Sequence, residues 1–238
     1  MITKSVVKDI QSLAGKKYRD QAGLFLAEGP KLVEELLRDC SHSIKAIYAL
    51  ESWIQQNQIV NSSIQVTLVT PAELERLSQL TTPHEVLAVV SKFPISPLQI
   101  DKGLTLVCCG IQDPGNFGTI LRTADWFGVR QLVCSPDTVD VYNPKVVQAT
   151  MGSIARLAVH YMDLDPWLNE QEVPIYAAIL NGQSVYEINR SQSGILLIGN
   201  EAKEVPASLL TKKVTGITIP KIGEAESLNA AVATGILL

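Results

Sequence analysis

Apolar and polar residues alternate along the chain in patterns that predict helices and strands in regular succession. Val6, Ile10 and Leu13 recur at helical spacing, so Thr3–Ala14 is predicted to be a short amphipathic helix with its lysines outward. The sequence Thr-Pro-Ala-Glu from Thr70 has the form of a capping box and predicts a helix that continues to about residue 80. The pattern therefore indicates many short elements and no long helix.

Ten strands and four further helices follow from the same reasoning. Strands are predicted over Gly23–Ala27, Ile44–Leu50, Ile64–Val69, Glu85–Phe93, Thr105–Ile111, Gln131–Cys134, Leu157–Tyr161, Ile175–Leu180, Gly194–Gly199 and Val214–Ile219. Helices are predicted from Pro30, over Thr119–Phe127, over Pro144–Ile154 and after Ser227, whose hydroxyl is expected to cap the last one.

Strands that alternate with helices indicate an α/β protein, and a proline-containing stretch divides it into two domains. Pro94 and Pro97 precede a polar run, so residues 94–103 are predicted to be a linker between a smaller α/β domain at 1–93 and a second domain at 104–238. The run Thr105–Ile111 is almost entirely apolar, which is typical of a strand buried on both faces of a parallel sheet.

The charge distribution favours an anionic partner for the first domain, although the whole chain is acidic. The formal net charge is −4, which by itself argues against nucleic acid. Up to residue 19, however, the chain carries five basic residues and one acidic residue, Asp9; the basic ones are Lys4, Lys8, Lys16, Lys17 and Arg19. Two interpretations remain open, a phosphate-binding surface or a solvated helix face.

The remaining composition narrows the class of protein. The hydrophobic fraction of 46% indicates globular domains, and we expect neither a membrane-spanning helix nor a signal peptide. The four cysteines lack CxxC spacing and are expected to be buried reduced thiols, as in a protein of the reducing cytoplasm. Three scattered histidines make a metal site improbable, and no metal is predicted.

Three loops rich in glycine and small polar residues follow predicted strands. They are Asp113–Gly118, which is expected to be a turn, Ile198–Glu201, and Ile219–Asn229. Ligands of parallel α/β sheets bind at the carboxyl ends of strands, where these loops lie. Each loop alone has an ordinary structural explanation, and the chain contains neither GxGxxG nor GxxxxGK[ST]. We therefore expect a nucleotide-like ligand held by loop backbone.

Together the loops resemble the three motifs of the SpoU (TrmH-like) family of RNA ribose methyltransferases. The matching residues are Asn116, Gly118 and Arg122, then Ile198, Gly199 and Glu201, then Ile219, Pro220, Gly223, Ser227, Leu228 and Asn229. The chain departs from the family pattern at Glu204 and at Ala230-Ala231. The first domain resembles the auxiliary RNA-binding domain of that family at Lys16, Lys17, Arg19, Leu24–Gly29 and Thr82–Val90.

The resemblance implies a fold, a cofactor and a set of roles. The second domain would be a parallel α/β domain with a deep trefoil knot that binds S-adenosylmethionine, and the protein would be a homodimer formed through it. Its substrate would be the ribose 2′-hydroxyl of structured RNA, either ribosomal or transfer RNA, with ribosomal RNA favoured. The implied catalytic residues are Asn116, Arg122, Glu201, Ser227 and Asn229; the implied cofactor contacts are Leu180, Gly199, Ile219 and Leu228; the implied RNA contacts are Lys16, Lys17 and Arg19.

Two alternatives remain beside this interpretation. The same fold could serve RNA binding with catalysis lost, although every polar motif residue is present. A knotted scaffold could also methylate a base through a different set of motifs, for which the sequence gives no positive signal.

Overall fold

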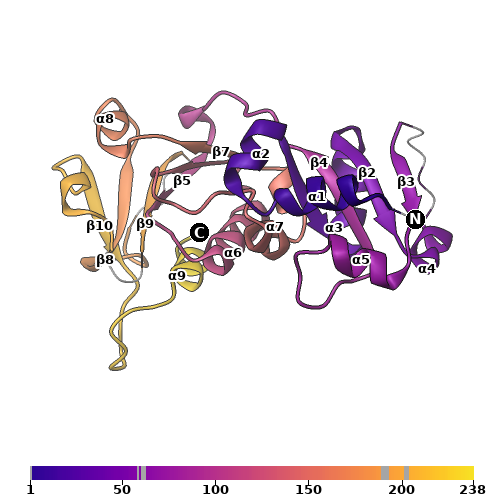
Figure 1. Cartoon of the computed structure of the whole chain (residues 1–238). Helices are drawn as coiled ribbons and strands as arrows, with labels where there is room; N and C mark the ends of the chain where they lie inside the picture. Colours follow the sequence, from indigo (N-terminus) through magenta and orange to yellow (C-terminus); the bar gives the residue numbers. More distant parts are fainter. Residues whose placement is uncertain (1, 58, 60–62, 189–192, 201–203) are drawn as a thin grey trace. The chain divides into compact units, whose positions relative to one another are not determined.

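The computed structural model describes residues 2–57, 59, 63–188, 193–200 and 204–238, and the chain forms two compact units. The first unit contains Met1–Pro94 together with Asp140–Ala155, and the second contains Ile95–Val139 and Arg156–Leu238. Figure 1 shows the elements of both. The sequence assigned Asp140–Ala155 to the second domain, whereas its contacts place it in the first unit.

The first unit is built on a four-stranded sheet with the order β1-β4-β2-β3, in which only the β2–β3 pair is parallel. Its elements are α1 (Lys4–Ser12), α2 (Lys16–Ala22), β1 (Leu24–Glu28), α3 (Pro30–Cys40), β2 (Ile44–Ala49), α4 (Glu51–Gln56), β3 (Gln65–Leu68), α5 (Pro71–Leu77), β4 (Val86–Ser91) and α7 (Pro144–Thr150).

Helices cover both faces of this sheet. Side chains of α1 and α5 pack with Leu26 of β1 and with Leu87 and Val89 of β4, while α3 contacts the sheet through β1, β2 and β4. The predicted capping box at α5 is confirmed, because the Thr70 hydroxyl and the Glu73 carboxylate cap each other's backbone. Neither α2 nor α4 was predicted, because short helices of mixed polarity carry little periodicity.

Specific contacts explain why Asp140–Ala155 belongs to the first unit. The ring of Tyr142 lies 4.9 Å from that of Phe25, and its hydroxyl accepts a hydrogen bond from the Phe93 backbone at 2.9 Å. Helix α7 contacts β1, and Gly152 lies so close to Glu35 of α3 that a Cβ there would stand 2.7 Å from the Glu35 Cβ. These contacts join residues far apart in the sequence, so local sequence patterns do not predict them.

The second unit is a parallel six-stranded sheet with the order β10-β8-β9-β5-β6-β7, as expected for an α/β domain. Its elements are β5 (Leu104–Cys109), α6 (Pro114–Trp126), β6 (Gln131–Cys134), β7 (Ala158–Tyr161), α8 (Leu164–Asn169), β8 (Ile175–Ser184), β9 (Gly194–Gly199), β10 (Val214–Thr218) and α9 (Ala230–Leu237). Helix α8 was not predicted.

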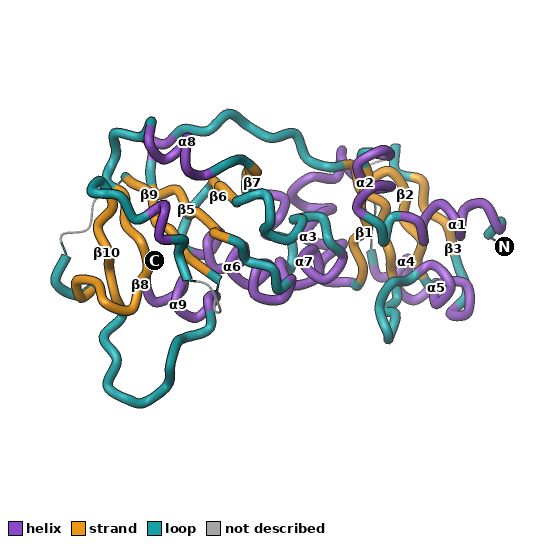
Figure 2. Tube along the Cα trace, turned by 60° about the vertical axis from the view of Figure 1, so that its left-hand side comes forward, coloured by secondary structure: helices purple, strands orange, loops and turns teal. Residues whose placement is uncertain are grey.

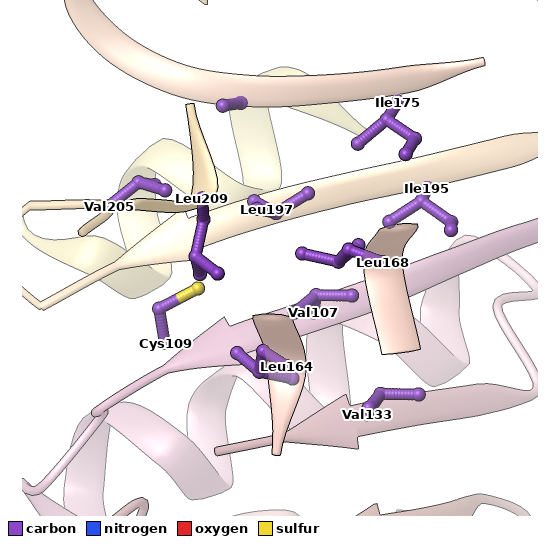
Figure 3. Close-up of a cluster of buried hydrophobic side chains, with 11 residues drawn as sticks. Val107, Cys109, Val133, Leu164, Leu168, Ile175, Ile195, Leu197, Val205 and Leu209 are labelled. Atoms are coloured by element: carbon purple, nitrogen blue, oxygen red, sulfur yellow. The ribbon is translucent and has the colours of Figure 1, made fainter. Parts of the chain in front are cut away.

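Apolar side chains fill the core on both faces of this sheet. On one face Val107, Leu197 and Ile195 of the central strands pack against Leu164 and Leu168 of α8, as Figure 3 shows. On the other face, α6 and α9 lie side by side in both views and are in contact, and α9 also contacts β9 (Figures 1 and 2). The apolar run predicted to be buried on both faces is thus confirmed for β5.

Two helix starts differ from those predicted. The stretch from Asp113 is not a free turn, because α6 begins at Pro114 and the Asp113 carboxylate accepts a hydrogen bond from the Asn116 backbone at 2.7 Å. The first motif therefore lies on a helix. Helix α9 begins at Ala230 with Asn229 as its cap, not Ser227, because Asn229 Oδ1 accepts from two backbone amides of the first turn.

Candidate active site

A cavity of about 340 Å³ opens where three neighbouring strands of the parallel sheet end. Its walls are the carboxyl ends of β8, β9 and β10 and the segment that links β10 to α9. The lining includes Leu180, Ile198, Gly199, Ile217, Thr218, Ile219, Ile222, Ser227, Leu228, Ala230, Ala233 and Leu237. All four residues expected to contact a cofactor are among them, so the two loops of the second and third motifs form one site.

One wall of the cavity is an excursion of β8. The partner of β10 changes from Ala177, opposite Gly216, to Gln183, opposite Ile217, so residues 178–182 are skipped in the register. The excursion closes tightly, because a Cβ on Gly182 would lie 2.6 Å from the Gly216 carbonyl carbon. The Thr218 hydroxyl donates to the carbonyl of Leu180, in the middle of the excursion, at 3.0 Å. The sequence predicted neither the excursion nor the role of Thr218.

Gly199 at the end of β9 brings two backbone segments together. A Cβ on this residue would lie 2.1 Å from the Glu204 carbonyl carbon, a distance at which no side chain fits. Asn200 and Glu204 form a β-bridge, in which the Glu204 amide donates to the Asn200 carbonyl at 2.7 Å. The glycine is therefore required for the loop's shape. Glu201, the acidic residue of the second motif, lies outside the described residues.

The first and third motifs meet through their asparagines, which are 113 residues apart in the sequence. Asn229 Nδ2 donates to Asn116 Oδ1 at 2.9 Å. Asn229 Oδ1 accepts from the Ala231 and Val232 amides at 3.0 and 3.3 Å, which fixes the side chain at the start of α9. The hydrogen bond between these two side chains thus joins the first turn of α6 to the start of α9, next to Leu228 of the cavity.

Arg122 and Ser227 are exposed, but they lie in different surroundings. Ser227 lines the cavity, whereas Arg122 does not and forms no hydrogen bond or ion pair with any residue in the described part of the chain. Arg122 shares a face of α6 with Trp126, four residues on, whose side chain is 86% exposed. All five donors of the guanidinium are thus available to a ligand or a partner.

The basic segment of the first unit divides into two kinds of residue. Lys16 and Lys17 are exposed at the start of α2. Arg19 is only 2% exposed, and its guanidinium donates to Asp140 at 2.6 Å and to the carbonyl oxygens of Leu13 and Ala14 at 3.0 and 2.7 Å. The expectation that Arg19 contacts RNA is therefore corrected, because a buried guanidinium with its donors bonded cannot reach a phosphate.

The cysteines are confirmed as buried free thiols. Burial raises the pKa of Cys109 well above that of an ordinary thiol, so the group stays protonated and unreactive. Within the described residues, no helix is long and apolar enough to cross a membrane, and no three histidine, cysteine or acidic side chains gather as a metal site.

Comparison with known proteins matches both parts of the chain to family models. Residues 103–238 match the model described as the SpoU rRNA Methylase family, and residues 4–88 match the MRM3-like substrate binding domain. A 23S rRNA (guanosine(2553)-2′-O)-methyltransferase from Bacillus subtilis is 34% identical over 98% of this chain and 94% of its own length.

Two solved structures are similar along the whole chain. A TrmH-family protein from Porphyromonas gingivalis is 36% identical with a TM-score of 0.87, covering 100% of this chain and 96% of its own. An AdoMet-bound rRNA methyltransferase from Sinorhizobium meliloti is 30% identical with a TM-score of 0.85, covering 100% and 94%. The loops of the second and third motifs line one cavity, Asn116 of the first motif is hydrogen-bonded to Asn229 of the third, and the family model matches more than half of the chain: the protein belongs to the SpoU rRNA methylase family.

Proposed function

We propose that the protein transfers a methyl group from S-adenosylmethionine to a ribose 2′-hydroxyl in structured RNA, ribosomal rather than transfer RNA. The observation that carries this proposal is the single cavity that gathers Leu180, Gly199, Ile219 and Leu228 beside the Asn116–Asn229 pair. The names of the Bacillus subtilis and Sinorhizobium meliloti relatives, both rRNA methyltransferases, support the choice of RNA.

The cavity fits the proposed cofactor. Its lining is mainly apolar, which suits an adenosine ring, and the backbone ends of three strands supply donors and acceptors for polar groups. Gly199 lines the cavity, and its lack of a side chain lets the Glu204 backbone pack against the end of β9. We assign Leu180, Gly199, Ile219 and Leu228 to cofactor binding. When bound, the cofactor supplies a sulfonium methyl group, which is already a strong electrophile.

The protein then has to orient the ribose and stabilise the charge that develops on its 2′-oxygen. The O–CH₃ bond forms as the S–CH₃ bond breaks, and the hydroxyl proton is lost to solvent or to a base. A guanidinium in a protein stays protonated, so Arg122 is assigned to binding the adjacent phosphate and stabilising the alkoxide. We assign Asn116 and Asn229 to orienting the ribose or this arginine, Ser227 to substrate contact, and Glu201 to holding hydrogen-bond donors.

We also propose a homodimer formed through α6 and α9. These adjacent helices expose apolar side chains, with Trp126 at 86%, Phe127 at 51% and Val232 at 52% exposed, and such a patch is typical of an interaction surface. Because Arg122 shares a face with Trp126, dimerisation there would bring it to the partner's site. Sedimentation should show a dimer, and Trp126→Glu should release monomers; a monomeric wild type would end this proposal.

Composite sites give the dimer a second test. Arg122→Ala subunits mixed with subunits whose cofactor loop carries Ile219→Asp should regain partial activity after subunit exchange, because one intact composite site forms. An absence of recovery after demonstrated exchange would mean that each subunit works alone.

The trefoil knot is likewise proposed, on the strength of the family resemblance and the matching parallel sheet. An experimental structure of the second unit would show whether the last segment passes through a loop. We further propose that the protein works in the cytoplasm, which the four buried free thiols support.

The activity itself is tested with a cofactor that carries a labelled methyl group. Isothermal titration should detect S-adenosylmethionine binding, and nuclease digestion followed by mass analysis of ribosomal RNA treated with enzyme should show the label on a ribose. Comparing RNA from wild-type and deletion strains would then identify the nucleotide. Label on a base would favour the base-methylating alternative, and cofactor-independent RNA binding without transfer would favour the binding protein.

A further inference from the structure

An open apolar groove of about 490 Å³ lies on the first unit, between α1 and α2. Its floor is formed by strand residues, Leu24, Ala46, Tyr48 and Val89, on the sheet face where α1 and α5 pack. One wall is formed by residues of α1 and by the residue that follows it: Val6, Asp9, Ile10, Ser12 and Leu13. The other wall is formed by Tyr18, Gln21 and Ala22 of α2. Between the two helices the apolar side of the sheet therefore reaches solvent.

The wall formed by α2 combines an aromatic ring with positive charge. Tyr18 is 54% exposed, and its ring lies over Gly15, where a Cβ would stand 3.2 Å from the ring. Gln21 and Ala22, three and four residues on, share its helix face. Lys17 lies one turn before Gln21 and is exposed, so its ammonium group can reach the rim of the groove.

Polar groups inside the groove complement the edge of a heterocyclic base. The Asp9 carboxylate accepts hydrogen bonds, the Gln21 amide donates and accepts, and the Tyr48 hydroxyl can donate. Burial raises the pKa of Tyr48, so this hydroxyl stays protonated at neutral pH. An apolar floor with an aromatic wall suits the faces of a base, while a lysine at the rim suits a phosphate.

We propose that this groove binds an unpaired nucleobase of the RNA substrate, with Tyr18 as the stacking platform and Lys17 on the adjoining phosphate. The inference rests on the proposed function, and deepens it: the first unit would select RNA that presents an unstacked base, in addition to binding phosphates. Residues 4–88, which include the whole α1–α2 wall, match a substrate-binding family model, and this supports RNA as the occupant.

Stacking can be measured directly with a fluorescent base. The probes are an RNA hairpin with 2-aminopurine in a six-nucleotide unpaired loop, and a fully paired duplex with the same number of phosphates. Wild type should bind the hairpin more tightly than the duplex and quench its fluorescence. Tyr18→Ala should weaken hairpin binding by between about fivefold and about a hundredfold and abolish the quenching, since one stacked base contributes about 1–3 kcal/mol.

Matched variants separate stacking from charge and from folding. Tyr18→Phe keeps the ring and should bind nearly as wild type, whereas Ala22→Glu places an acid in the groove and should weaken binding without removing the tyrosine. Lys17→Ala should lower the salt dependence of both probes, each lost phosphate contact reducing the log–log slope by roughly 0.7–0.9. Lys8→Ala removes the same charge from the opposite side of α1 and should change neither probe.

The outcomes distinguish this proposal from the proposed activity. A wild type that binds the hairpin and quenches its fluorescence but transfers no methyl group would refute the activity and leave the groove proposal standing. Unchanged hairpin affinity and quenching in both Tyr18→Ala and Ala22→Glu would overturn the groove proposal. If either variant changed the sedimentation of the protein but not its RNA binding, the groove proposal would be overturned, and the groove would instead contact a second copy of the chain.

Discussion

The surroundings of two arginines, Arg19 in the first unit and Arg122 in the second, differ in what they leave for a ligand. The guanidinium of Arg19 is buried, pairs with Asp140 and donates to two carbonyl oxygens at the end of α1. The guanidinium of Arg122 is exposed and has no bond to a described residue. From the sequence, Arg19 was expected to contact RNA and Arg122 to be catalytic. The hydrogen bonds of the two guanidinium groups show that Arg19 has a structural role and that Arg122 is available to a ligand.

Removing Arg19 should produce the largest change in stability. Arg19→Ala would leave the mostly buried Asp140 with its charge uncompensated and two carbonyl oxygens without this donor, at a cost of about 3–5 kcal/mol in the free energy of unfolding. Urea denaturation measures this loss. Lys17→Ala, two residues away and exposed, is the matched control and should cost less than about 0.5 kcal/mol. Equal stabilities of the two variants would show that the Arg19–Asp140 pair contributes nothing.

Removing Arg122 should lower activity and leave stability nearly unchanged, the opposite of the effect expected for Arg19. Arg122→Ala should lower methyl transfer by about a hundredfold to a thousandfold, the usual effect of losing one stabilising donor group, with cofactor affinity within a few-fold of wild type. Arg122→Lys should fail as well, because a point charge cannot reproduce a planar fork. Stability should be nearly unaffected, since the exposed side chain forms no hydrogen bond or ion pair with a described residue. Near-normal turnover in either variant would remove Arg122 from the mechanism.

The sequence predicts features that depend on local patterns better than features that depend on contacts between distant residues. The sheet strands follow from apolar runs, which are local features, whereas Gly199 and Ile219 were expected to contact a cofactor because their loops resemble the family motifs. The burial of Arg19 depends on Asp140, 121 positions away, and no local pattern distinguishes it from Lys16 and Lys17. Short helices such as α2 depend on such distant packing too.

Some of the missed features did carry a local signal. Asp113 followed by Pro114 is a helix-start pattern, since aspartate caps well and proline suits the first helical position; α6 could have been predicted from it. At α9 the sequence offers two capping residues, Ser227 and Asn229, and propensity alone does not decide between them. The bond from Asn229 to Asn116, again a distant contact, fixes the choice.

Asn229 has both a structural and a candidate functional role. Its side-chain oxygen caps α9, and its side-chain nitrogen donates a hydrogen bond to Asn116 of the first motif. Asn229→Ala should lower the free energy of unfolding by about 1 kcal/mol through the lost cap, and turnover should fall as well. Asn229→Asp keeps the capping oxygen and loses the donor, so stability should stay near wild type while turnover still falls. If the Asn229→Asp enzyme has normal turnover, the hydrogen bond to Asn116 has only a structural role between α6 and α9.

The smallest expected effect concerns Glu28, a buried carboxyl group of the first unit. It is 6% exposed, and it accepts hydrogen bonds from the Ser78 hydroxyl and, at 3.0 Å, from the Gln79 amide. Burial raises its pKa above the ordinary value of 4.5 despite these bonds. Because the folded state holds this proton more tightly than the unfolded chain, the protonated group's advantage is complete below pH 4.5 and is lost as the pH rises through the folded pKa.

Glu28→Gln should therefore make stability less dependent on pH in that range, and at neutral pH change it by less than about 1 kcal/mol. The amide keeps an acceptor for Gln79 and can donate to the Ser78 hydroxyl, so the loop after α5 stays attached to β1. Glu75→Gln, on the exposed face of α5, is the matched control and should leave the pH profile of wild type. Chemical denaturation between pH 4 and 8 compares the three proteins. A Glu28→Gln profile parallel to that of wild type would mean that the folded and unfolded chains bind this proton equally.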